Sequence, residues 1–211
     1  MVDTSPFDSF GFQVAFACQA LPTDAARHDV EYHGWSRGRH TGPWLYVEID
    51  VSGERHWVGR FERGPADYPF TGTFGCPHPD YLLVAASGQA YVVNARAPQG
   101  SGGWAQPPIM PVLGVRRVEG TPLVVLWDFQ DMAAYGPEGL RWRLSHFATD
   151  GLKVTEARDG VVRGTLWLGG YERDDLVTFR VEASTGRVLV GSEALERHGA
   201  RLLTGQLAAR G

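Results

Sequence analysis

The dominant pattern along the chain is a short apolar segment, a turn that contains glycine, and a second short apolar segment. It occurs around Gly53, Gly88 and Gly186, between residues 44–51 and 55–61, 81–86 and 89–95, and 176–183 and 187–190. Glycine adopts the positive φ of tight hairpin turns without steric cost, so each pattern predicts an antiparallel pair of strands.

Other segments continue this pattern on both sides of a proline-rich and glycine-rich stretch. Apolar and smaller residues alternate over residues 10–18, which predicts an early strand with one buried face. Further strands are expected over residues 112–118, 123–129, 140–144, 153–157 and 161–168. Leucines at helical spacing after Ser192 predict a short C-terminal helix over about residues 193–203, although Gly199 weakens it.

These elements predict an all-β protein whose antiparallel hairpins and meanders form stacked or partly closed sheets, with a short C-terminal helix. The hairpin glycines are unevenly spaced, so a small β-propeller is the alternative rather than the first choice. A chain of 211 residues is long enough for one β-rich domain spanning residues 1–211. Residues 97–111 hold four prolines and three glycines and mark a possible subdomain boundary.

Charge and composition limit the classes of partner and the compartment. A formal net charge of −4 gives no excess positive field for a phosphate backbone, so we expect no nucleic-acid partner. The first eight residues lack the basic and apolar regions of a signal peptide, and no apolar run is long enough to span a membrane. With only two cysteines, Cys18 and Cys76, the sequence predicts a cytoplasmic protein without a disulfide framework.

Two polar segments have the residue types of a metal site but not the spacing. In the segment from His28 to His33, Asp29, Glu31 and His33 occupy every second position and would lie on one side of an extended chain. The interpretation favoured here is the solvated face of an edge strand. Cys76, His78 and Asp80 alternate with two prolines, which favours a stiff turn. The sequence therefore predicts neither a metal site nor a cofactor.

Catalytic candidates are few. Asp128 and Asp131 follow an apolar strand, and His146 follows another, so these three residues are the candidates for a small hydrolase or ligand-binding enzyme. The sequence contains no Gly-x-Ser-x-Gly elbow, His-Glu-x-x-His motif or phosphate-binding loop. These features favour a protein that is not an enzyme.

Aromatic and basic residues in glycine-rich loops are the candidates for binding. Tryptophan is enriched at binding hot spots, and arginine presents a planar set of donors. The candidate binding residues are Trp35, Arg37, Arg39, His40 and Trp104. We therefore expect a binding or interaction protein that engages another protein, of which inhibitory or immunity-type binding is one form. A carbohydrate-binding module is a further alternative and requires tryptophans on an exposed face.

Overall fold

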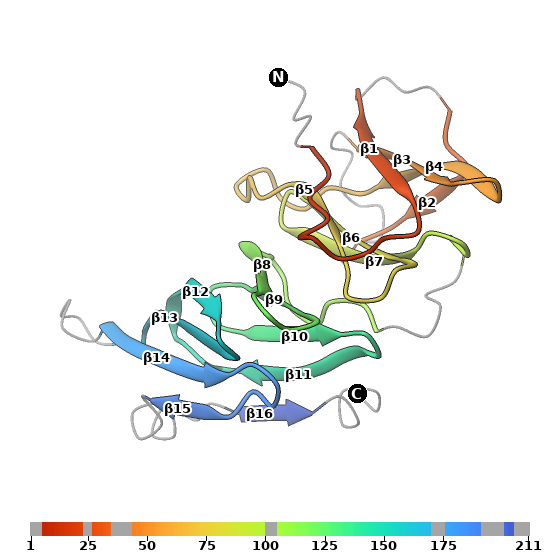
Figure 1. The fold of residues 1–211 in the computed structure, drawn as a ribbon. Coiled ribbons are helices and arrows are strands. Elements are labelled where there is room, and N and C mark those ends of the chain that lie inside the picture. Colours follow the sequence, from red (N-terminus) through yellow and green to blue (C-terminus); the bar gives the residue numbers. More distant parts are fainter. Residues whose placement is uncertain are drawn as a thin grey trace. The chain divides into compact units, whose positions relative to one another are not determined.

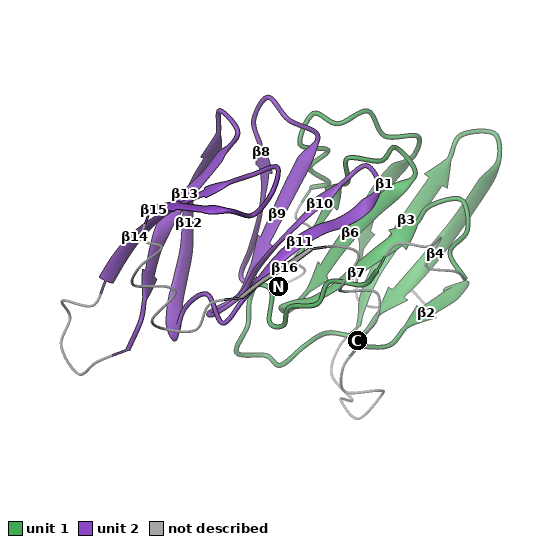
Figure 2. Cartoon of the chain, turned by 90° about the horizontal axis from the view of Figure 1, so that it is seen from below, with its two compact units in different colours: residues 1–112 green, residues 113–211 purple. Residues whose placement is uncertain are grey.

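The computed structural model consists of strands joined by turns in all of its described parts (Figure 1). It describes residues 6–22, 27–34, 44–99, 105–169 and 176–190, together with the backbone of residues 201–204. No helix among these residues is long and apolar enough to cross a membrane. The chain divides into two compact units, Met1–Val112 (unit 1) and Leu113–Gly211 (unit 2), which Figure 2 shows in different colours.

Unit 1 contains two sheets. The first has the strand order β1-β3-β4-β2 and the second has the order β5-β6-β7. The strands are β1 (Ala17–Leu21), β2 (Val30–Tyr32), β3 (Leu45–Val51), β4 (Arg55–Phe61), β5 (Gly72–Gly75), β6 (Tyr81–Ala86) and β7 (Gln89–Asn94). Two of the glycine turns foreseen from the sequence lie here, because Gly53 joins β3 to β4 and Gly88 joins β6 to β7, both with positive φ. Strand β2 differs from the others because it pairs in parallel with β4.

The core of unit 1 is formed by side chains from both of its sheets. Alternate residues of β3, such as Val47 and Ile49, pack with Leu82 and Val84 of β6. Trp57 of β4 is only 1% exposed, and its indole Nε1 donates a hydrogen bond of 2.9 Å to the carbonyl of Ala95. Ala95 directly follows β7, so this bond joins the first sheet to the end of the second.

The outer edge of β7 is covered by the chain that follows it. The side-chain amide of Gln106 accepts from the Val92 amide at 3.0 Å and donates to the Val92 carbonyl at 2.9 Å. Further along, the Val112 amide donates to the Gly88 carbonyl at 2.7 Å. Gln106 thus occupies the two groups that a neighbouring strand would use, which protects the edge against pairing with other chains.

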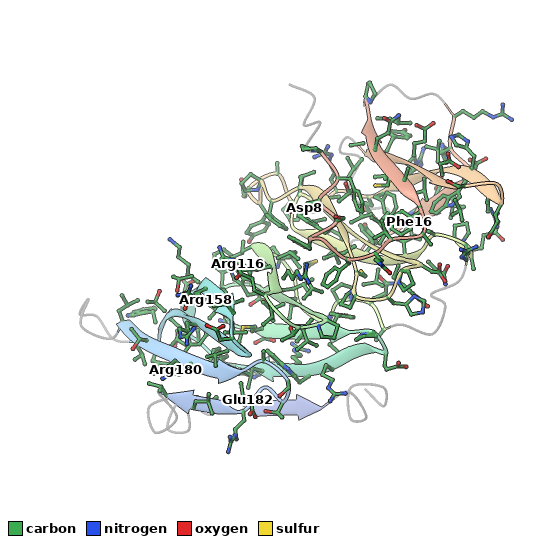
Figure 3. The ribbon with its side chains drawn as sticks, viewed as in Figure 1. Asp8, Phe16, Arg116, Arg158, Arg180 and Glu182 are labelled. Atoms are coloured by element: carbon green, nitrogen blue, oxygen red, sulfur yellow. The ribbon has the colours of Figure 1, made fainter. Side chains whose placement is uncertain are left out.

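Unit 2 also contains two sheets, with strand orders β16-β11-β10-β9-β8 and β12-β13-β14-β15. The strands are β8 (Gly114–Val118), β9 (Leu123–Trp127), β10 (Met132–Gly136), β11 (Gly139–Ser145), β12 (Asp150–Arg158), β13 (Val161–Trp167), β14 (Leu176–Glu182), β15 (Val188–Val190) and β16 (Arg201–Thr204). Phe179 in β14 is buried and Arg180 beside it is exposed, as expected for a sheet with one buried face. Figure 3 labels Arg158, Arg180 and Glu182 on these strands.

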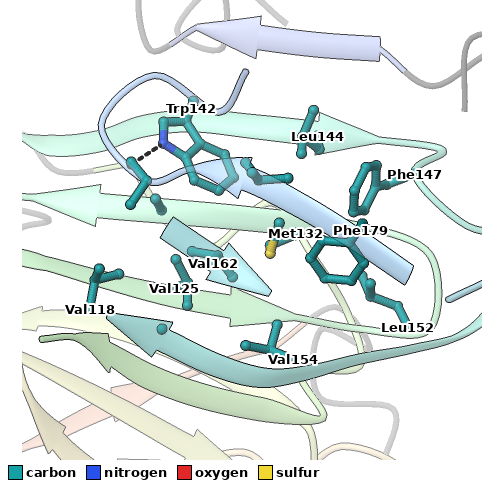
Figure 4. Packing of buried hydrophobic residues seen from close by; sticks show 14 of the residues in the cluster. Val118, Val125, Met132, Trp142, Leu144, Phe147, Leu152, Val154, Val162 and Phe179 are labelled. Carbon is teal, nitrogen blue, oxygen red and sulfur yellow. Dashed lines mark hydrogen bonds between the residues drawn. The ribbon is translucent and has the colours of Figure 1, made fainter. Parts of the chain in front are cut away.

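The core of unit 2 has the same kind of link between sheets as the core of unit 1. Trp142 of β11 is 1% exposed and donates from Nε1 to the carbonyl of Ala183 at 2.8 Å (Figure 4). Around it, Met132, Leu144 and Phe147 pack with side chains of the facing sheet, including Phe179. The Phe147 and Phe179 rings meet edge to face with centroids 5.0 Å apart.

The two units resemble one another in how this link is anchored. Each accepting alanine directly follows the last residue of a strand, β7 in unit 1 and β14 in unit 2. In unit 1, the Ala95 amide donates to the carbonyl of Asp80, the residue before β6; in unit 2, the Ala183 amide donates to Gly160, the residue before β13, and both bonds are 2.8 Å long. The same local arrangement therefore holds a buried indole in each unit.

Three expectations about the fold require correction. The C-terminal helix is not supported, since residues 201–204 form strand β16 and pair with β11, while residues 191–200 lie outside the described residues. Pairing with β11 gives these backbone groups the hydrogen bonds that a helix would have supplied. The strands described in the structure close neither a barrel nor a propeller, because they form four separate sheets.

The third correction concerns the strand expected over residues 10–18, which begins only at Ala17. Phe10 and Gly11 have positive φ, and their amides donate to the side chains of Asp8 and Ser9. These side-chain bonds favour a turn over an extended strand.

Replacing Trp142 with phenylalanine removes the indole donor and leaves the Ala183 carbonyl without it. We expect Trp142→Phe to lower the free energy of unfolding by about 2 to 4 kcal/mol, through the lost bond and the smaller ring. Urea denaturation measures the change, with Trp167→Phe as the control because Trp167 is only partly buried. Equal losses in the two variants would contradict a special role for the link.

Replacing Gln106 with alanine uncovers Val92 at the edge of β7. We expect Gln106→Ala to self-associate more strongly than the wild type, because the free amide and carbonyl can pair with another chain. Sedimentation velocity over a concentration series measures this, with the exposed Gln13→Ala as control. An unchanged monomer fraction in Gln106→Ala would show that Gln106 does not protect the edge.

Candidate functional site

A pocket lined by polar and aromatic groups lies in unit 1, beside β2 and β7. It has a volume of about 640 Å3. Its lining comes from three chain segments: Glu31, Tyr32, His33 and Gly34; Gln89, Ala90 and Tyr91; and Gln106 with Pro107. β2 and β7 are each the last strand of a sheet, so the pocket lies beside two sheet edges. A volume of this size is typical of ligand sites.

Glu31 is the centre of the charged groups beside this pocket. Its Oε1 lies 2.8 Å from His28 Nε2 and 3.0 Å from Arg60 Nη2, and its Oε2 lies 3.4 Å from His33 Nε2. The hydrogen bond from His28 lowers the pKa of Glu31, with a further contribution from Arg60. The guanidinium of Arg60 also lies over the Trp44 ring, 4.1 Å from its centroid. Glu31 is therefore a carboxylate that stays ionised at neutral pH.

The inner part of the pocket is fixed by hydrogen bonds of two tyrosines and Glu62. The Tyr91 hydroxyl donates to the Glu62 carbonyl at 2.6 Å, and the Tyr32 hydroxyl donates to the Pro98 carbonyl at 2.5 Å. The Glu62 carboxylate, 2% exposed, accepts from the Gly34 amide at 2.8 Å. Burial raises the pKa of both tyrosines, so they remain neutral. The pocket wall is thus rigid, and its rings are held in place.

The structure matches the edge-strand interpretation of residues 28–33. β2 is an edge strand whose Val30 and Tyr32 face the core, while Glu31 and the flanking residues Asp29 and His33 are exposed. Asp29 uses its carboxylate to accept from the Val58 amide at 2.8 Å. No set of three or more His, Cys, Asp or Glu side chains in the described part of the chain is placed to hold a metal ion.

Residues 76–80 form the turn that the two prolines suggest. The Tyr81 amide donates to the His78 carbonyl at 3.2 Å, and the Asp80 carboxylate accepts from Arg96 Nε at 2.8 Å. Cys76 is buried, and burial raises the pKa of its thiol. Partial burial also raises the pKa of the Cys18 thiol, to about 11. Neither thiol is activated as a nucleophile.

The catalytic candidates Asp128, Asp131 and His146 come together in unit 2, where the turn after β9 meets the end of β11. Asp128 Oδ1 accepts from the backbone amides of Gln130 and Asp131, both at 2.6 Å. Asp131 Oδ1 accepts from the His146 amide at 2.8 Å, and its Oδ2 accepts from Arg143 Nε at 3.0 Å and from Arg143 Nη2. The three candidates therefore belong to one cluster, which His146 joins through its backbone amide.

The contacts of the two carboxylates in this cluster are chiefly with backbone amides and with Arg143. The His146 imidazole meets the neighbouring Ser145 hydroxyl at 3.2 Å, whereas only its backbone amide meets Asp131. The φ of His146 is 54°, a conformation rare outside glycine, and the Asp131 bond stabilises it. A catalytic triad needs an imidazole between carboxylate and nucleophile, and here the serine lies between them, 3.5 Å from Asp131.

The loop residues expected to bind a partner lie outside the described residues. Trp35, Arg37, Arg39, His40 and Trp104 belong to residues 35–43 and 100–104. In the sequence, however, these two segments adjoin Gly34 and Ala105, and Gly34 and Gln106 line the pocket. Their role in binding stays a prediction.

The tryptophans that the structure describes form no exposed platform. Trp57 and Trp142 are buried, and Trp44, Trp127 and Trp167 are partly buried. A carbohydrate-binding module needs two coplanar rings on an exposed face, and the described part of the chain does not supply them.

Sequence reasoning missed most of the pocket. Its residues come from segments near positions 32, 90 and 106, which only the folded sheets bring together. The alternation of polar residues over 28–33 did indicate β2, but nothing in the sequence linked it to Tyr91 or Gln106. Arg143 and Ser145 were missed in the same way, because their partner Asp131 lies on another strand end.

Comparison with known proteins adds no relative to this description. No protein-family model, no curated protein and no solved structure matches the chain.

The buried carboxylate of Asp128 gives a pH-dependent prediction. Desolvation raises the pKa of Asp128, so ionising this carboxyl group destabilises the folded protein. The destabilisation is absent in acid and develops as the pH rises from the ordinary pKa of an aspartate through the raised pKa. Asparagine keeps the oxygen that accepts the two amide bonds. We expect Asp128→Asn to be slightly more stable than the wild type at pH 7 and equal to it in acid.

Thermal unfolding across pH 3 to 7 measures this difference, with Asp128→Ala as the comparison. The alanine variant loses the acceptor for two amides and should be less stable than the wild type at every pH. An asparagine variant that is less stable at pH 7 would show that the negative charge itself holds the turn.

Proposed function

We propose that the protein is a non-catalytic binding module that engages another protein through the pocket beside β2 and β7. The observation that carries this proposal is the convergence of Glu31, two ordered tyrosines and His33 in one pocket beside the last strands of two sheets. A ligand there meets aromatic area and a few fixed polar groups, which is the usual composition of a binding site.

A protein partner fits the position of this pocket. The exposed side chains of Glu31 and His33 form its rim on an edge strand, where a partner chain can approach without crossing another element of the sheet. The segments that carry the predicted binding residues Trp35 and Trp104 lie next to the pocket residues Gly34 and Gln106 in the sequence. Both cysteines are free thiols, which supports the proposal that the protein works in the reducing cytoplasm.

The hydrolase alternative has weaker support. Its residues do gather, but the two carboxylates are occupied by backbone amides and by Arg143. A general base needs a carboxylate or imidazole free to take a proton from a substrate. The arrangement favours a structural role for this cluster.

Site-specific photo-cross-linking in the native host tests the proposal. A benzoylphenylalanine at position 33 replaces a side chain that is 50% exposed on the pocket rim. The same residue at position 56 is the matched control, because it replaces another exposed histidine of the same unit, 59% exposed, outside the pocket. We expect a discrete protein adduct at position 33 and only background at position 56. Equal, diffuse adducts at both positions would contradict the proposed site.

A further inference from the structure

We propose that unit 2 holds a binding site for a small apolar molecule that carries one carboxylate group. The site is a pocket of about 970 Å3 whose described lining lies entirely in unit 2. It shares no described residue with the pocket beside β2 and β7, so this inference goes beyond the proposed function and can fail without it.

Three turns of unit 2 meet at this pocket. They are the turns that join β8 to β9, β10 to β11 and β14 to β15, and β11 continues the lining. The lining includes Leu123 and Trp142, which are buried in the core of unit 2. Pro122 and Pro137 are exposed and Leu140 is partly exposed, so a ligand can cover apolar surface that the fold leaves in contact with water. Pockets of this size with an apolar lining are typical of small-molecule sites.

A β-bulge directs Arg141 toward this apolar surface. The register between β10 and β11 shifts at Arg141, which has no partner of its own on β10. In a regular strand, residues 141 and 142 would point to opposite faces of the sheet. Here they bond two successive carbonyls: Trp142 Nε1 donates to Ala183 at 2.8 Å, and Arg141 Nε donates to Ser184 at 3.4 Å. The bulge thus places both side chains on the pocket side of β11.

The guanidinium of Arg141 is available to a ligand. Arg141 is exposed, and its one hydrogen bond to the described residues uses Nε, which leaves both Nη groups without a partner there. No carboxylate in the described part of the chain pairs with it. The Ser184 hydroxyl, which is free of partners among the same residues, belongs to the same lining. Guanidinium nitrogens bind the two oxygens of a carboxylate side by side, so these groups fit a carboxylate.

Glu138 limits the ligand to a single negative charge. It is the one other charged residue in the described lining, and it is exposed in the turn between β10 and β11. The described residues offer it no hydrogen bond or ion pair, whereas Arg141 is held by its bond to Ser184. The fixed charge of the pocket is therefore positive. A second anionic group on the ligand would be repelled by Glu138.

Titrations of the full-length protein, followed by the backbone amide NMR signals of Glu138, Leu140 and Thr185, test the inference. The probes are the apolar acids hydrocinnamate and octanoate, the neutral hydrocinnamide, the cation phenylpropylammonium, the dicarboxylate phenylsuccinate, and acetate. We expect the two apolar acids to shift these signals, phenylsuccinate to bind more weakly, and the other probes to leave the signals in place. Arg141→Gln should weaken binding of hydrocinnamate by about fivefold, as expected for loss of a charge-assisted bond.

Arg116→Gln is the matched control, because Arg116 is also exposed and also donates to a backbone carbonyl, that of Thr155, in unit 2 outside the pocket lining. It should bind hydrocinnamate like the wild type, and thermal unfolding checks that both variants fold. Equal binding of hydrocinnamide or phenylpropylammonium, or equal weakening in both variants, would overturn the carboxylate ligand. Phenylsuccinate bound as tightly as hydrocinnamate would overturn the single charge, and equal shifts with acetate would overturn the apolar part. No shift with either apolar acid would overturn the site itself.

Discussion

The structure depends on a buried indole that donates across each pair of sheets. A tryptophan inside a β core fills more volume than any other side chain, but its N–H must find an acceptor. In both units the acceptor is the carbonyl of an alanine at the end of a strand in the opposite sheet, Ala95 in unit 1 and Ala183 in unit 2. The indole N–H must point at the alanine carbonyl for this bond to form, so the bond constrains the position of one sheet against the other within each unit.

This constraint also positions the proposed binding site. Trp57 holds β4 against the end of β7, and β2 pairs with β4. The separation between β2 and β7, and with it the shape of the pocket, follows from that link. Phe61 of β4 contributes as well, because it stacks on Tyr32 with centroids 4.5 Å apart and meets Tyr91 at 5.4 Å. A site formed at two sheet edges therefore gains its rigidity from the core beneath it.

Local sequence rules predicted the parts of the fold that depend on local chemistry. The turns at Gly53, Gly88 and Gly186 follow from glycine, since all three have the positive φ that such turns need. The rules failed where strands that pair are far apart in the sequence. They also failed where side chains bond the backbone amides that a strand would use in its hydrogen-bond ladder. They could not foresee the parallel pairing of β2 with β4, and they missed the turn that Asp8 and Ser9 impose near Phe10. The strand β16 was mistaken for part of a helix because its leucines also fit helical spacing.

The candidate sites show the same division. Their positions after a strand made Asp128 and Asp131 candidates, and the structure places them in one cluster with His146. Only the folded structure shows that their carboxylates accept from backbone amides and from Arg143. The pocket is formed by three separate segments, and no single one of them predicts it.

The most direct test of the whole account is hydrogen exchange of the indole N–H groups by NMR. The account predicts that the Trp57 and Trp142 indoles exchange only through unfolding of their unit, far more slowly than that of Trp167. Rapid exchange of either one in the folded protein would contradict it.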